Sequence, residues 1–319
     1  MRIDFIDKLR GVAIILVVMG HVIEKGLGIY NTISNLCYVT FHMPLFMFLS
    51  GLFAIKGFEK WNSSETVIYI KKKICRLIIP FLTVGGIYSF KKYHCVITVL
   101  LGEDASYWFL PALFYCMMLE LLVGYLYYRF FPNGFLFDFG IHAVGYSIVV
   151  LFYVFISSKV PFLLYFIKMY PFFVIGAFYN KYNRVQAVCN SKILFTSSLA
   201  LFFVCIYLQT ILKLPFLFSG FFAIVLLINL FREYDSSISP SLAKLGKATL
   251  PIYVLHWFFL PSILPIGDYI SSIGGGDDQF LITLTISFII TVPIILICCI
   301  IYVILKRSKI LNLLLFGGV

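Results

Sequence analysis

Long apolar runs separated by short polar segments follow one another along almost the whole chain. A helix of about twenty apolar residues is long enough to cross the hydrocarbon core of a bilayer. The pattern therefore predicts an all-α, polytopic membrane protein with about ten transmembrane helices and no separate soluble domain, so that residues 1–319 form one transmembrane domain. The predicted spans are 10–29, 36–55, 74–90, 107–127, 141–157, 161–179, 193–212, 214–231, 248–266 and 279–305.

The polar segments between the spans differ in charge, and this predicts an orientation. If the N-terminus is cytoplasmic, 19 of the 25 lysines and arginines fall in inner segments, 5 fall in outer segments, and Lys168 lies inside a span. Inner loops of membrane proteins carry such an excess of positive charge. Both termini are therefore predicted to be cytoplasmic. The net charge of +11 is explained by this asymmetry and indicates no nucleic-acid partner.

Composition supports the same class of protein. The chain is 61% hydrophobic and 12% charged, with a mean hydropathy of +1.00. Soluble domains are about one quarter charged. Most of the eight cysteines lie in apolar runs and none form a Cys-x-x-Cys pair, so they are interpreted as packing residues.

The stretch "KLRGVAIILVVMGH" places an arginine and a histidine at the two ends of one apolar run. Arg10 and His21 are eleven residues apart, which is about three helical turns and about 16 Å along one face of a helix. Asp7, one turn before Arg10, can pair with it or cap the helix. An ionisable group at membrane depth is a functional candidate by default. The alternative for His21 is a structural hydrogen bond between helices.

Two further histidines lie at membrane depth. His42 occurs in "FHMPLFMFLSG", and His256 occurs in "GKATLPIYVLHWF", with Tyr253 one turn before it. A structural role and a functional role remain open for each. His94 and His142 lie nearer the ends of spans and are interpreted as structural. The histidines lack a His-x-x-x-His spacing, so no metal site is predicted.

Cations gather where the third span begins, in "KKKICRLIIP". Lys73 and Arg76 share a helix face, and Lys72 adds to the positive charge. They could be ordinary inner-surface anchors, or they could bind the phosphates of an anionic cofactor such as coenzyme A. Glu120 and Lys168 are charged residues inside spans. They could pair with each other, or they could take part in the candidate functional site.

Four segments in this order resemble the acyltransferase-3 family of integral membrane O-acyltransferases. They are "IDFIDKLRGVAIILVVMGH", "FHMPLFMFLSGLF" with Ser50, "YWFLPALF" with Trp108, and "LGKATLPIYVLH". The family often has an Arg-x-x-Arg pair where this chain has Lys73 and Arg76. Lysine retains the charge but loses the bidentate fork of arginine.

The resemblance implies transfer of an acyl group, most often acetyl from acetyl-CoA, to a hydroxyl of a bacterial cell-envelope polysaccharide or its lipid-linked precursor. The expected location is the bacterial cytoplasmic (inner) membrane, and no metal is expected. His21 would be the general base and Arg10 would orient the donor, whose phosphates would bind Lys72, Lys73 and Arg76. Direct transfer and a covalent acyl-histidine both remain open. Substrate or structural polar roles are expected for His42, Ser50, Trp108, Glu120, Tyr253 and His256.

Two other classes of function fit a polytopic chain. A transporter that exports a glycan, or flips its lipid-linked form, would use intramembrane charges to line its path. A membrane sensor is the other alternative, although no segment resembles a signalling domain.

Overall fold

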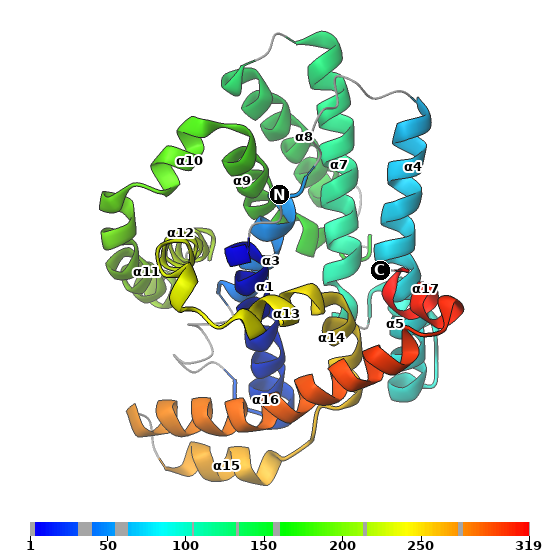
Figure 1. The fold of residues 1–319 in the computed structure, drawn as a ribbon, viewed down its shortest axis with the longest axis vertical. Coiled ribbons are helices and arrows are strands. Elements are labelled where there is room, and N and C mark those ends of the chain that lie inside the picture. Colours follow the sequence, from blue (N-terminus) through cyan, green and yellow to red (C-terminus); the bar gives the residue numbers. More distant parts are fainter. Residues whose placement is uncertain are drawn as a thin grey trace. The chain divides into compact units, whose positions relative to one another are not determined.

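The computed structural model describes residues 4–30, 40–54, 63–103, 105–131, 134–155, 160–212, 216–273 and 277–318. Over these ranges the chain forms helices and no strand, which confirms the all-α prediction (Figure 1). Within them, six helices are long and apolar enough to cross a bilayer, as expected of a multi-pass membrane protein. They are Ser63–Tyr93, Phe109–Phe130, Phe135–Phe155, Leu163–Lys181, Lys192–Gln209 and Gln279–Leu305.

The chain divides into two compact units. The first unit comprises Met1–Leu49 and Arg184–Ile304, and the second comprises Ser50–Asn183 and Leu305–Val319. The helices that lie wholly or mostly in the first unit are α1 (Asp4–His21), η1 (Val22–Gly26), α3 (His42–Gly51), α10 (Asn183–Cys189), α11 (Lys192–Leu212), α12 (Leu217–Glu233), η5 (Asp235–Ser237), α13 (Pro240–Lys247), α14 (Thr249–Leu255), η6 (His256–Phe258), α15 (Leu264–Ser272) and α16 (Asp277–Leu305).

Helix α1 is the centre of the first unit and packs against α12, α13 and α14. Its closest crossing is with α13. A Cβ on Gly11 would lie 2.2 Å from the Leu242 carbonyl oxygen, and a Cβ on Gly246 would lie 1.8 Å from the Asp7 carbonyl oxygen. Real Cβ atoms do not approach backbone so closely, so these two glycines let the backbones of α1 and α13 touch.

The predicted ninth span, 248–266, is not a single helix, and that prediction was wrong. Helix α14 ends at Leu255, a 3₁₀ turn follows over His256–Phe258, and the chain is non-helical until α15 begins at Leu264. Pro261 and Pro265 account for the break, because proline lacks an amide donor and disfavours helix at the residue before it. The amide of Ile263 instead donates to the Gly26 carbonyl oxygen at 2.9 Å.

The predicted second span, 36–55, is only partly covered by the described residues. Residues 36–39 and 55 lie outside them, and the helix in between, α3, has 10 residues.

In the second unit, α4, η3 and α5 run on as one continuous helix, and the neighbouring helices α7, α8 and α9 pack against one another in pairs (Figure 1). Helix α17 packs against η3 and α5. The helices of this unit are α4 (Ser63–Lys73), η3 (Ile74–Ile78), α5 (Ile79–Tyr93), α6 (Ile97–Leu101), η4 (Ala105–Tyr107), α7 (Phe109–Phe130), α8 (Phe135–Phe155), α9 (Leu163–Lys181) and α17 (Lys309–Phe316).

Candidate functional site

Two imidazoles that are far apart in the sequence stack on each other in the first unit. His21 is the last residue of α1, just before the π-helical turn η1, and His256 opens the 3₁₀ turn after α14. Their ring centroids are 5.3 Å apart and the rings are inclined by 15°. The ring of Trp257 lies 4.3 Å from that of His21. Two consecutive side chains at the start of the 3₁₀ turn thus lie against the ring of His21.

Hydrogen bonding fixes the protonation pattern of His256. The residue is fully buried, and its Nδ1 lies 3.1 Å from the Ile252 carbonyl oxygen. A carbonyl oxygen only accepts hydrogen bonds, so Nδ1 carries a proton and donates it. In the neutral ring Nε2 is then an acceptor. Within the described part of the chain, His256 Nε2 and His21 Nδ1 are buried without a hydrogen-bond partner. The pair therefore has two nitrogen atoms to which the described residues supply no hydrogen-bond partner.

Charged residues surround the beginning of α1. Of the two roles left open for Asp7, the structure shows the pairing with Arg10, because a guanidinium nitrogen lies 3.4 Å from the Asp7 carboxylate. Lys8 is buried and donates to Asp235, at 2.7 Å to the carboxylate and 2.6 Å to the backbone oxygen. Because α1 is helical from Asp4 to His21, Arg10 lies about 16 Å from His21 along the helix axis.

Three other predicted residues lie on α3 and α14. His42 is buried at the start of α3, and Ser50 is half-buried near its end. Tyr253 is buried on α14, with its ring 5.9 Å from that of His256. Tyr253 therefore extends the ring cluster of His21, His256 and Trp257.

The predicted phosphate-binding cations belong to the second unit. Lys72 is exposed at the end of α4, and Arg76 is exposed on the π-helical segment η3. Lys73 is half-buried, with its ammonium 5.0 Å from the centre of the Tyr69 ring. Trp108 stacks on Tyr165 at 4.5 Å, just before α7 begins.

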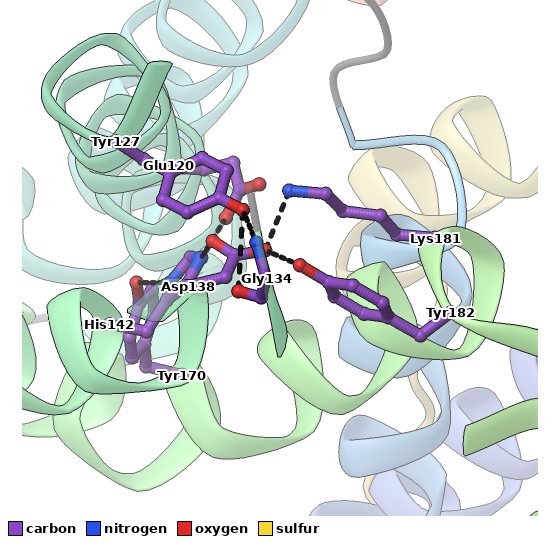
Figure 2. A network of polar contacts seen from close by, with 8 residues as sticks. All are labelled: Glu120, Tyr127, Gly134, Asp138, His142, Tyr170, Lys181 and Tyr182. Atoms are coloured by element: carbon purple, nitrogen blue, oxygen red, sulfur yellow. Dashed lines mark hydrogen bonds and ion pairs between the residues drawn. The ribbon is translucent and has the colours of Figure 1, made fainter. Parts of the chain in front are cut away.

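Glu120 also lies in the second unit, in a polar network between α7, α8 and α9 (Figure 2). Its carboxylate lies 3.6 Å from His142 Nε2, and the Asp138 carboxylate lies 3.5 Å from the same nitrogen. Lys168 is exposed on α9. Among the described residues, the close ionic contact of Glu120 is thus with His142 rather than with Lys168.

A family model described as the acyltransferase domain, of the acyltransferase 3 type, matches residues 3–303. The chain belongs to this family. It is therefore an acyltransferase. No curated protein and no solved structure matches the chain.

The sequence interpretation of this acyltransferase missed Asp138 and underrated His142. Asp138 was placed outside the fifth predicted span, but α8 begins at Phe135 and buries both side chains. The available signal was their i, i+4 spacing, which puts an acid and a base on one helix face. Trp257 was also overlooked, because an aromatic residue in an apolar run is ordinarily a packing residue.

The side chains that could bind a metal ion do not gather in the described part of this acyltransferase. Among the residues that the structure describes, no group of three or more histidines, cysteines and acids could hold a metal ion. The seven described cysteines form no disulfide, and Cys37 lies outside the described residues.

Proposed function

We propose that this acyltransferase moves an acetyl group from acetyl-CoA to a hydroxyl of a cell-envelope polysaccharide or its lipid-linked precursor. It would work in the bacterial cytoplasmic membrane, with ten spans and both termini in the cytoplasm. The observation that carries the proposal is the stacked pair of His21 and His256, each of which has a buried nitrogen without a hydrogen-bond partner among the described residues.

A sugar hydroxyl is a weak nucleophile at neutral pH and needs a base to accept its proton as it attacks. Imidazole is suited to that role. His21 is the base in this proposal, and His256, fixed by its hydrogen bond to Ile252, orients the ring of His21. The new bond joins the hydroxyl oxygen to the acyl carbon, the carbon–sulfur bond breaks, and the proton passes through His21 to the coenzyme A thiolate.

A covalent variant of this mechanism uses the same residues. The acyl group would move first to a His21 nitrogen and then to the hydroxyl oxygen. Both variants release coenzyme A as the free thiol, so the atoms balance in each.

The donor would be held by cations. Arg10 on α1 would orient the acyl donor, while Lys72, Lys73 and Arg76 would bind the phosphates of coenzyme A. The exposure of Lys72 and Arg76 supports this role, because both side chains reach the surface of the second unit. Binding of phosphate to lysine and arginine uses charge-assisted hydrogen bonds, which are stronger than neutral ones.

Replacement of the proposed base tests the reaction. His21→Ala should abolish transfer of labelled acetyl from acetyl-CoA to a crude glycan acceptor by the reconstituted protein, while the amount of protein in the membrane stays normal. General-base catalysis contributes about 10²- to 10⁴-fold to rate. Glycans from cells that carry His21→Ala should also lack the mass of one acetyl group.

His94→Asn is the matched control. His94 is exposed and has a positive φ of 54°, a conformation that asparagine tolerates. This variant should keep full activity. Full activity in His21→Ala would refute the proposed base, and movement of unmodified glycan without acetylation would refute the proposed reaction.

A further inference from the structure

The network of Figure 2 contains two acidic and two basic side chains in the bundle of α7, α8 and α9. Glu120, Asp138 and His142 are buried, with 8%, 3% and 4% of their surfaces exposed, and the Lys181 side chain is 35% exposed. The mechanism above uses none of the four. An uncompensated charge in such a position costs several kcal/mol, about as much as the whole stability margin of many domains.

Asp138 and Lys181 compensate each other. The Lys181 ammonium donates to Asp138 Oδ2 at 2.6 Å, and the Tyr182 hydroxyl donates to the same oxygen at 2.7 Å. Burial, followed by this hydrogen bond, raises the pKa of Tyr182, so its hydroxyl keeps the proton that it donates. The ammonium also lies 4.6 Å from the centre of the Tyr127 ring. The Asp138 carboxylate therefore accepts hydrogen bonds from two donors, and one of them, the Lys181 ammonium, is a cation.

His142 Nε2 lies 3.5 Å from the Asp138 carboxylate and 3.6 Å from that of Glu120, and Lys181 already balances the charge of Asp138. Among the described residues, Glu120 Oε2 is buried without a hydrogen-bond partner, and it faces His142 Nε2 at 3.6 Å. The other ring nitrogen, Nδ1, lies 2.8 Å from the Tyr170 hydroxyl. The carboxylate oxygen thus points at a ring nitrogen across a gap slightly longer than a hydrogen bond.

We propose that Glu120 and His142 form a buried proton-binding site that holds one proton. With Asp138 negative and Lys181 positive, only two states of the pair leave the network neutral. In one state Glu120 is protonated and His142 is neutral, and in the other Glu120 is ionised and His142 is an imidazolium. Each state contains one shared proton. Without it the pair adds one negative charge, and with a second proton it adds one positive charge.

Among the described residues, Asp138 and Lys181 are the charged groups that act electrostatically on both Glu120 and His142. The tyrosines and the cysteine that interact electrostatically with Glu120 or Lys181 are uncharged when protonated: Tyr69 of α4, Cys116 and Tyr128 of α7, and Tyr170 of α9. Arg129 is exposed at the end of α7.

Spectroscopy of the purified full chain at neutral pH tests the proposal. The infrared carbonyl stretch of a protonated carboxyl reports on Glu120, and nitrogen NMR of the imidazole reports on His142. Wild type should show one proton on the pair. In Glu120→Gln the imidazole should be neutral. In His142→Phe the carboxyl of Glu120 should be protonated. His142→Gln serves the same purpose if the phenylalanine variant does not fold.

Asp268→Asn is the control, because Asp268 is an exposed carboxyl of the other unit and its loss should leave both signals unchanged. Wild type with an ionised Glu120 and a neutral His142 would overturn the proposal. So would an imidazolium in Glu120→Gln or an ionised Glu120 in His142→Phe. None of these measurements depends on an acyl donor, so the proposed proton site and the proposed transfer reaction can fail separately.

Discussion

At the candidate site, a single turn of the chain carries the two aromatic side chains that contact His21. The 3₁₀ turn after α14 begins at His256, and the rings of both His256 and Trp257 lie close to the ring of His21. The carbonyl of Ile252 then holds one nitrogen of His256 and leaves the other as an acceptor. Local backbone geometry, rather than residue type alone, thus makes these histidines a pair.

Arg76 offers a separate test of donor binding. It is exposed on η3, where a π-helical turn widens the helix. Arg76→Ala should raise the KM for acetyl-CoA between about 10-fold and 150-fold, the range expected for the loss of a charged hydrogen bond worth about 1.5–3 kcal/mol. The kcat should change little. Steady-state kinetics with acetyl-CoA and with acetyl-pantetheine, which lacks the nucleotide phosphates, measures both effects.

The truncated donor identifies the group that Arg76 binds. Its KM should be the same in wild type and in Arg76→Ala, because the phosphates are missing in both cases. Lys91→Ala provides a matched control, since Lys91 is also exposed but lies near the end of α5. An unchanged KM for acetyl-CoA in Arg76→Ala would show that Arg76 is only an anchor at the membrane surface.

The crossing of α1 and α13 positions the helix that carries Arg10 and His21. Gly246→Ala would put a Cβ 1.8 Å from the Asp7 carbonyl oxygen, so the two helices must separate. Overpacking of this kind costs about 1–3 kcal/mol. We expect a lower midpoint of thermal unfolding in detergent, together with reduced acetyl transfer. Gly140→Ala is the control, because a Cβ there meets nothing within 4 Å, and its midpoint should be equal or slightly higher.

Apolar periodicity predicted the uninterrupted helices well. The run 193–212 became α11 (Lys192–Leu212), and the run 279–305 became most of α16 (Asp277–Leu305). The run 248–266 was incorrectly predicted to be one continuous helix, because hydropathy alone does not take account of proline. Pro261 and Pro265 lack the backbone amide that a continuous helix needs for its hydrogen bonds. Similarly, Asp138 looked like a loop residue because a charge lowers the local hydropathy even where tertiary contacts bury it.

The candidate site could be predicted only in part. The spacing of Arg10 and His21 along α1 follows from helix geometry and could be calculated in advance. The stacking of His21 on His256 depends on how α1 packs against α14, and such long-range contacts leave no trace in a single sequence. The Glu120–His142 contact has the same origin, since its partners come from α7 and α8.

The orientation of the whole chain is the remaining prediction, and cysteine labelling can test it. The excess of lysine and arginine in alternate segments predicts that Glu103 is outside and Arg184 inside, and both residues are exposed. A membrane-impermeant maleimide should therefore label Glu103→Cys in intact cells. It should label Arg184→Cys only after the membrane is permeabilised, because the bilayer otherwise separates the reagent from that thiol. Unsubstituted protein gives the background from the native cysteines. The reverse pattern would place both termini outside the cytoplasm and would separate Lys72, Lys73 and Arg76 from the cellular pool of acetyl-CoA.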